Sequence, residues 1–239
     1  MAQASIKQII KQEYIKCAQD PVYFMKKYCY IQHPTRGRVQ FNLYPFQEAT
    51  LKLLQKNDRS IILKSRQLGI STLSAGISLW MMLFQKDKAI LVIATKQDTA
   101  KNLVTKVKFM YDNLPSWLQI GFVENNKLAL RLKNGSQIKA VSAAGDAGRS
   151  EAISLLIIDE AAFIETNKIT GGKAIVLSTP NGTGNFFHKM WIKAQEGRNG
   201  FTPIKLPWTV HPERNQDWRD KQDDELGLRM AAQECDNHI

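Results

Sequence analysis

The sequence has few of the residues that build disulfide frameworks and histidine-based metal centres. Its 239 residues contain three cysteines and four histidines. The cysteines are an odd number without metal-ligand spacing, and the histidines are scattered along the chain. These residues are Cys17, Cys29, Cys235, His33, His188, His211 and His238. We therefore expect free thiols in a reducing compartment and no metal site built on histidine.

Long apolar runs are also missing. No segment approaches the roughly 18 uninterrupted apolar residues that a membrane span requires. The N-terminal residues MAQASIKQII lack the apolar region of a secretory signal. We expect a soluble intracellular protein with no membrane partner. Because 44% of the residues are hydrophobic, the chain can bury a core, and its length suits one large domain or one domain with a small appendage.

The charge of the chain is unbalanced. The formal net charge is +11, and the excess is regional. Residues 86–139 contain ten Lys and Arg against four Asp and Glu, whereas residues 213–236 contain eight acidic residues against four basic ones. A basic region suits a polyanionic partner, although solvated surface lysines are the ordinary alternative.

From Arg59 onward, strand-like and helix-like segments alternate. Apolar runs typical of strands cover residues 61–63, 89–94, 153–158 and 174–177, and helical patterns cover residues 72–84 and 98–111. Apolar strands without alternation, joined by helices, are typical of a parallel sheet that is covered on both faces. We therefore predict an α/β fold. Asn134-Gly135, between two alternating segments, predicts a β-hairpin beside this sheet.

Two regions are predicted along the chain. Residues 1–184 hold N-terminal helices and the α/β core, and residues 185–239 form a small C-terminal subdomain with a helix, a strand and acidic helical segments. One connection within the core is short: about a dozen residues of poor helix character follow Glu160 before the strand at Ala174. A parallel crossover needs a dozen or more residues and usually contains a helix. We therefore expect residues to be missing from the chain near positions 165–168.

The most informative segment is KSRQLGIST, residues 64–72, which lies between a strand-like run and a helix. A strand that ends in a glycine-bearing loop and continues into a helix surrounds an anion with backbone N–H groups. The usual phosphate-loop pattern, G-x-x-x-x-G-K-[ST], has lysine where this chain has Ile70. Lys64 or Arg66 can supply the cation instead, and Ser71 keeps the hydroxyl that ligates Mg²⁺. An ordinary strand-to-helix turn is the alternative.

Two further strand ends carry polar residues. Asp159 and Glu160 follow the apolar run that begins at Leu155, so Asp159 can hold Mg²⁺ through water and Glu160 can deprotonate an attacking water molecule. Capping of the next helix is the alternative for this pair. After the strand that ends at Leu177, Thr179 and Asn181 can sense a γ-phosphate, or can belong to a plain β-turn.

Together these motifs resemble a known family. The segments SRQLGIST, LLIIDEAAFI and LSTPNG, with YPFQ upstream and LPWTVHPERNQDW downstream, resemble the large subunit of tailed-phage terminases, the ATP-driven motors that package viral DNA. The resemblance covers about residues 41–234. It implies a P-loop NTPase of the RecA type, and it implies that this chain lacks the nuclease domain that follows in such proteins.

The resemblance also implies roles for individual residues. Lys64, Ser65, Arg66, Gln67, Leu68, Gly69, Ile70, Ser71 and Thr72 form the Walker A loop, which binds ATP. Ser71 and Asp159, the Walker B carboxylate, hold Mg²⁺, Glu160 is the catalytic base, and Thr179 and Asn181 belong to the coupling motif. Tyr44 and Gln47 resemble the adenine-recognising element, although Tyr44 on its own reads as a core aromatic residue. Arg66 and Arg149 are candidate catalytic cations.

Arg149 resembles an arginine finger, with a surface arginine as the alternative. If it acts from a neighbouring subunit, the monomer is expected to hydrolyse ATP slowly, because such a finger contributes about 10³ to 10⁵ in rate. The resemblance implies double-stranded DNA, a portal protein and a terminase small subunit as partners. It also implies a homo-oligomeric ring on the portal, with a monomer as an option for the isolated chain, and a location in the host cytoplasm.

DNA contact is expected from exposed basic residues that do not read bases. Lys96, Lys101, Lys106 and Lys108 lie on or beside one predicted helix, with a solvated helix face as the alternative. Two other functions fit parts of the pattern. A helicase-like DNA-dependent ATPase needs a second RecA-like domain, for which the residues after 185 are too few. A non-hydrolysing DNA-binding or portal-binding module requires that Ile70 mark an inactive loop.

Overall fold

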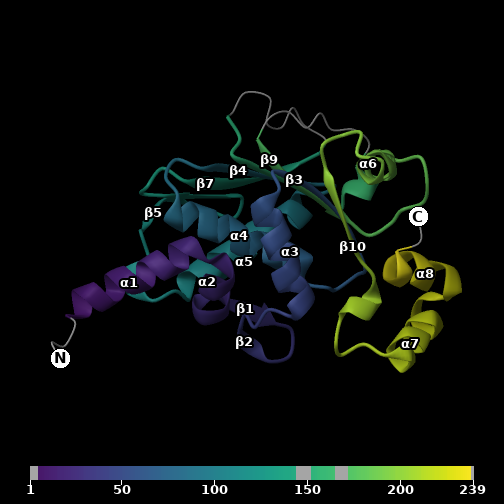
Figure 1. Cartoon of the computed structure of the whole chain (residues 1–239), viewed down its shortest axis with the longest axis horizontal. Helices are drawn as coiled ribbons and strands as arrows, with labels where there is room; N and C mark the ends of the chain where they lie inside the picture. The colour runs from purple at the N-terminus through teal and green to yellow at the C-terminus, as the bar shows by residue number, and fades with distance from the viewer. Residues whose placement is uncertain (1–4, 144–151, 165–171, 238–239) are drawn as a thin grey trace.

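The fold is an α/β sandwich around one mixed sheet, seen in a computed structural model that describes residues 5–143, 152–164 and 172–237 (Figure 1). Eight strands form the sheet in the order β10-β3-β9-β8-β4-β7-β6-β5. Their bounds are Thr202–Leu206 (β10), Arg59–Lys64 (β3), Lys173–Ser178 (β9), Leu155–Asp159 (β8), Ala89–Ala94 (β4), Gln137–Ser142 (β7), Ala129–Leu132 (β6) and Phe122–Asn125 (β5). The first six are parallel, and β6 and β5 continue the sheet antiparallel.

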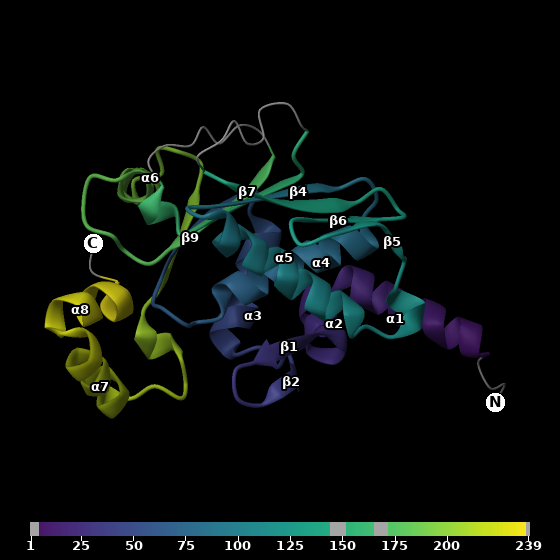
Figure 2. The same cartoon turned by 180° about the vertical axis from the view of Figure 1, so that it is seen from behind.

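Helices cover both faces of the sheet (Figures 1 and 2). One face packs against α3 (Pro45–Lys56), α4 (Ile70–Phe84) and α5 (Gln97–Asp112), and the other against α6 (Phe186–Gln195). Strand β3 shows why its sequence is apolar throughout: Ile62 belongs to the first core, whereas Ile61 and Leu63 belong to the second. The α/β fold predicted from the sequence is confirmed, as is the hairpin at Asn134-Gly135, whose strands are β6 and β7.

Smaller elements extend this core. Helices α1 (Ile6–Gln19) and α2 (Pro21–Tyr28) precede a hairpin of β1 (Tyr30–His33) and β2 (Gly37–Gln40). Short 3-10 helices cover Ser116–Leu118 (η1), Ala161–Phe163 (η2) and Trp208–Val210 (η3), and the chain ends with α7 (Gln216–Leu226) and α8 (Leu228–Asp236). The sequence prediction missed β1, β2 and β5, because these strands have four residues each and are mostly exposed or half-buried.

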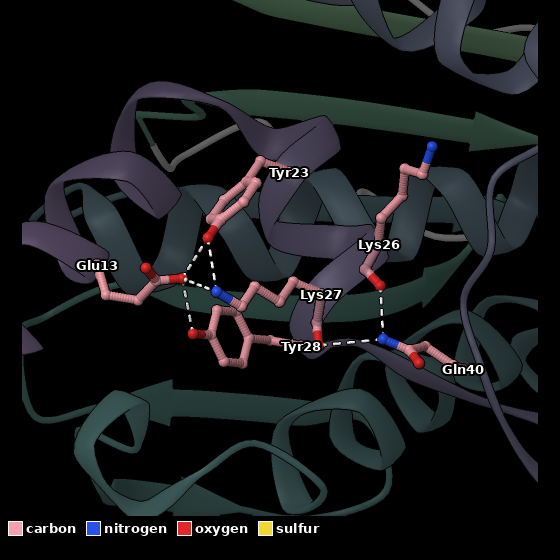
Figure 3. Close-up of polar contacts among 6 residues, drawn as sticks. All are labelled: Glu13, Tyr23, Lys26, Lys27, Tyr28 and Gln40. Carbon is pink, nitrogen blue, oxygen red and sulfur yellow. Dashed lines mark hydrogen bonds and ion pairs between the residues drawn. The ribbon is translucent and has the colours of Figure 1, made fainter.

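A polar cluster joins the first two helices (Figure 3). The Glu13 carboxylate accepts hydrogen bonds from the Lys27 ammonium at 2.7 Å and from the Tyr28 hydroxyl at 2.8 Å, and also from the Tyr23 hydroxyl. Bonds from Lys27 and the two tyrosines lower the pKa of Glu13 to about 2. We call these four residues the N-terminal cluster. It fixes α1 against α2 at the end of the molecule opposite to α7 and α8 (Figure 1).

Some of the residues after position 185 belong to the main sheet. Strand β10 lies after residue 185, yet it is the edge strand of the main sheet and pairs in parallel with β3. In the described part of the chain, η3, α7 and α8 follow β10. The division of the chain into residues 1–184 and a small subdomain of residues 185–239 therefore stays a prediction. The expected gap near residues 165–168 lies outside the described residues.

The prediction of free thiols is confirmed: all three cysteines are buried and unpaired, and burial raises the pKa of Cys17 to about 12. No helix in the described part of the chain is both long and apolar enough to cross a membrane.

Candidate active site

The segment predicted to bind phosphate joins a strand directly to a helix. Strand β3 ends at Lys64 and α4 begins at Ile70, with Gly69 as its N-cap residue. Gly69 has a φ of 72°, which glycine adopts without strain. A Cβ at this position would lie only 2.7 Å from the side-chain Nε2 of Gln47. Ile70 is 1% exposed and lies in the core, so its side chain does not replace the usual lysine. The loop thus presents the N-terminus of a long helix to an anion.

Gln47 supports this loop from the start of α3. Its Nε2 donates to the Leu68 carbonyl at 2.9 Å, its Oε1 accepts from the Tyr44 amide at 3.1 Å, and it is 4% exposed. The Tyr44 ring contacts the His211 ring at a centroid distance of 4.5 Å. Tyr44, Gln47, Gly69 and His211 line one cavity of about 640 Å³ beside the loop. This cavity therefore connects Tyr44 with the predicted phosphate loop, and the contact of Tyr44 and Gln47 with a base stays a prediction.

The outer side of the loop is bonded to the C-terminal part of the chain. The Ser65 amide donates to the Leu206 carbonyl at 2.8 Å, and the Arg66 amide donates to the Glu234 carbonyl of α8 at 2.9 Å. Asn237 also donates from its side chain to the Leu63 carbonyl, at 3.4 Å. Residues more than 140 positions later in the chain therefore fix the shape of this loop.

Arg214 makes the largest set of these contacts. Its guanidinium donates two hydrogen bonds of 3.1 Å to the Arg66 carbonyl, one of 3.1 Å to the Gln67 carbonyl and one of 3.4 Å to the Ser65 hydroxyl. The Cζ atom of the guanidinium lies 4.2 Å from the centroid of the Trp218 ring. Burial lowers the pKa of Arg214, and the positive charge of Arg66 lowers it further. Sequence reasoning gave Arg214 no role, because only the fold brings it to the loop.

The carboxylate pair lies at the same edge of the sheet. Asp159 is the last residue of β8, is 7% exposed and accepts the Glu160 amide at 2.9 Å. Glu160 is exposed, has a φ of 56° and accepts a hydrogen bond from the Thr95 hydroxyl at 3.0 Å. A non-glycine residue with this backbone conformation costs roughly 1 to 3 kcal/mol, a strain that is concentrated at functional sites. The turn directs the Glu160 carboxylate away from the strand and toward Thr95 at the end of β4.

The segment after β9 connects the carboxylate pair to α8. The Ser178 hydroxyl accepts the Ala162 amide at 3.1 Å, and the Asn181 side chain donates to the Ala162 carbonyl at 3.3 Å. The Pro180 carbonyl accepts from the Gln233 side chain at 2.8 Å. Asn181 therefore contacts the backbone just after Glu160, and the roles of Thr179 and Asn181 as phosphate sensors stay predictions.

Lys106 lies on α5, the helix on which the sequence placed it. Like Lys101 and Lys108, with which it was grouped as a DNA contact, it is half-buried, and that role stays a prediction. Burial lowers the pKa of its ammonium, the Asp159 carboxylate raises it, and the Lys64 charge lowers it. The fold thus brings Lys106 close to two predicted site residues. Arg149, in contrast, lies outside the described residues.

The predicted Mg²⁺ ligands fit the ion's usual chemistry. Mg²⁺ is commonly bound by one or two protein oxygen ligands together with substrate phosphates and water. Asp159 is a buried carboxylate that has used one lone pair, on the Glu160 amide, and Ser71 lies in the first turn of α4. No group of three or more His, Cys, Asp or Glu side chains able to hold a metal occurs in the described residues. A Mg²⁺ ion here would therefore require phosphate oxygens as well.

A glycine-bearing loop at a helix N-terminus, with a carboxylate pair at a nearby strand end, defines the class of P-loop ATPase folds. Sequence comparison specifies the family. The chain belongs to the terminase large subunits, because the sequence model of the N-terminal domain of the T4-like-virus type matches residues 61–235.

Solved structures share the fold. The large terminase of bacteriophage HK97 matches 92% of this chain with a TM-score of 0.73 and 16% identity. The large terminase ATPase domain of Thermus phage P74-26 covers 75% with a TM-score of 0.62 and 20% identity. The large terminase of a thermophilic bacteriophage, in complex with ATP-gamma-S, covers 81% with a TM-score of 0.63 and 10% identity. The chain spans 55%, 87% and 52% of these proteins, respectively, so it corresponds to about half of the first and the third.

Proposed function

We propose that this chain hydrolyses ATP and uses the energy to move double-stranded DNA into a viral procapsid. One observation carries the proposal: the phosphate loop, the segment after β9 and the carboxylate pair follow three adjacent parallel strands, β3, β9 and β8. Ligands of open α/β sheets bind at the carboxyl ends of the strands. The relative from the thermophilic bacteriophage is described in complex with ATP-gamma-S, which supports a nucleotide as the ligand.

In this proposal the loop amides and the N-terminus of α4 bind the phosphates, and Lys64 or Arg66 supplies positive charge. Ser71 and Asp159 would hold Mg²⁺, which supplies electrostatic stabilisation of the phosphate oxygens when it is bound. Glu160 orients the attacking water molecule and accepts its proton. Tyr44 and Gln47 contact the base. Loss of the γ-phosphate changes the contacts of residues 178–181, and Gln233 passes that change to α8.

Exposed lysines are the proposed contacts with DNA. On α5, Lys101 lies 4.0 Å from Asp98, and Lys108 is bonded to Asp112 at 2.7 Å. Both pairs are partly exposed, and exposed pairs contribute little, so the ammonium groups can exchange to phosphates. A grip that is independent of sequence predicts that affinity falls steeply with salt. The other proposed partners are the portal protein and the terminase small subunit, with a homo-oligomeric ring on the portal and the host cytoplasm as the location.

Steady-state ATP hydrolysis by wild type and Glu160→Gln tests the proposal. General base catalysis contributes about 10² to 10⁴ in rate, so we expect the variant to lose about that factor while it still binds Mg²⁺-ATP. Glu124→Gln is the matched control, because Glu124 is exposed on the edge strand β5, at the opposite end of the sheet from β10. Equal phosphate release from wild type and Glu160→Gln would remove the catalytic assignment and favour a non-hydrolysing module.

A further inference from the structure

Lys106 faces a cavity that leads to the phosphate loop. A space of about 410 Å³ is lined by Lys106 of α5, by Thr72 in the first turn of α4 and by Gln32 of β1. Thr72 and Gln32 also line the larger cavity that contains Tyr44 and Gly69. Figure 2 shows α5 beside α4 under the sheet, with the hairpin of β1 and β2 below them. The two cavities therefore meet at the start of α4, where the predicted phosphate site lies.

The Lys106 side chain is half-buried, and within the described residues no hydrogen bond or ion pair involves its ammonium. The Asp159 carboxylate and the Lys64 ammonium are both close enough to affect it. Withdrawing an unpaired charge from water is unfavourable unless a partner is bound. A lysine kept in such a place suits an anionic ligand that arrives between the loop and Asp159.

The phosphate loop lacks the cation that the usual pattern provides. At the position where the usual pattern places lysine, Ile70 is buried in the core. The Arg66 amide donates to the Glu234 carbonyl and the Arg66 carbonyl accepts from Arg214, while the Arg66 guanidinium, like the Lys64 ammonium, stays a candidate cation. A cation that approaches from α5 would add positive charge without any change in the loop.

We propose that Lys106 is a further phosphate-binding residue, which reaches from α5 to the γ-phosphate of ATP. This inference rests on the proposed function. It is an alternative to the assignment of Lys106 to DNA: Lys106 lines a cavity that shares Thr72 and Gln32 with the cavity beside the loop, whereas Lys101 on the same helix has the exposed carboxylate of Asp98 as its neighbour.

Calorimetric titration with Mg²⁺-ATPγS and Mg²⁺-ADP tests this role through binding alone. A hydrogen bond to a charged group contributes about 1.5 to 3 kcal/mol, so we expect Lys106→Met to weaken ATPγS binding at least tenfold. ADP binding, which lacks the contact, should change less than threefold. Lys106→Arg should recover part of the ATPγS affinity. Lys52→Met, at an exposed position on α3, is the control and should bind both nucleotides like wild type.

The outcomes separate this inference from the function on which it rests. If wild type binds neither nucleotide, the proposed function fails. If wild type binds both and Lys106→Met binds both equally well, or loses affinity for both by the same factor, the γ-phosphate contact is wrong. A reduced salt dependence of DNA binding with unchanged nucleotide affinity would return Lys106 to the DNA surface. Should Lys106→Met fail to fold, Lys106→Gln keeps a polar side chain of similar length and carries the same expectations.

Discussion

A charged cluster stabilises a pair of helices near each end of the chain. The two pairs differ in whether their helices contact the phosphate loop. In the N-terminal cluster, Glu13 joins α1 to α2 (Figure 3). In the C-terminal cluster, which we define as Arg219, Asp223 and Asp236, Arg219 joins α7 to α8. Within the described residues, only the second pair of helices bonds to the phosphate loop, through Glu234 of α8, and Arg214, which lies just before α7, adds further hydrogen bonds to it. Similar chemistry therefore supports local structure at one end and the proposed active site at the other.

Burial adds to this difference. Arg219 is 8% exposed, donates to both Asp236 oxygens at 3.0 and 2.8 Å and also bonds to Asp223. The bonds with Asp236 and Asp223 raise the pKa of Arg219 above its usual value. In the N-terminal cluster, the side chain of Lys27 is 47% exposed. Water competes for such a contact, so it contributes less.

The largest effect is expected from Arg219→Met. Removal of one partner from a buried ion pair costs about 3 kcal/mol or more, because a buried charge is left without compensation. We expect α7 and α8 to open locally, which removes the Glu234 and Gln233 contacts. Hydrogen exchange of residues 228–236 should rise, and the affinity for Mg²⁺-ATPγS should fall about tenfold. Faster exchange in α8 with unchanged nucleotide affinity would show that the C-terminal cluster does not support nucleotide binding.

A smaller effect on the stability of α7 and α8 is expected from Arg214→Ala. The variant removes hydrogen bonds from the Arg66 and Gln67 carbonyls but leaves the helices and their cluster intact. Because hydrogen bonds to a charged group contribute about 1.5 to 3 kcal/mol, we expect nucleotide affinity to fall about tenfold with little change in the exchange of residues 228–236. Arg214→Lys should recover little of the affinity, since one ammonium cannot match the fork of donors. Wild-type affinity in Arg214→Ala would show that the loop holds its shape without this contact.

The smallest effect is expected from Glu13→Gln. Exposed ion pairs contribute roughly 1 kcal/mol or less, so the melting temperature should fall by a few degrees and nucleotide affinity should stay at the wild-type value. A loss of nucleotide affinity in this variant would contradict the difference between the two ends of the chain.

The same carboxylate gives a dependence on pH. The pKa of Glu13 is lowered from 4.5 to about 2 in the folded chain, so its contribution to stability is present above pH 4.5 and is lost as the pH falls toward 2. The stability difference between wild type and Glu13→Gln should therefore shrink over this range in urea titrations. A difference that is constant from pH 6 to pH 3 would show that the Glu13 carboxylate is not held by Lys27 and the tyrosines.

The sequence indicated the parts of the site that depend on local pattern. Lys64 to Thr72 and the pair Asp159-Glu160 lie at the ends of apolar strands, so their place at one sheet edge follows from the order of strands and helices. The α/β fold follows from the same alternation.

No local pattern in the sequence predicts contacts between residues that lie far apart along the chain. Arg214 reaches the loop only because β10 pairs with β3, although β10 is the last strand along the chain. The helical spacing predicts on which face of α5 Lys106 lies, but it does not predict the cavity that Lys106 lines. Gln47 was placed near the base, but its hydrogen bond to the Leu68 carbonyl of the loop depends on how α3 packs against α4.

A structure of the chain with Mg²⁺-ATPγS tests the central claim most directly. We predict that the triphosphate lies along residues 64–72, with Mg²⁺ between the Ser71 hydroxyl and the Asp159 carboxylate, and with the γ-phosphate within hydrogen-bond distance of Lys64 or Arg66 and of Lys106. The outer side of the loop should keep its contacts with Arg214 and Glu234. A triphosphate bound away from the loop, or a loop that binds no nucleotide at saturating concentration, would contradict the account.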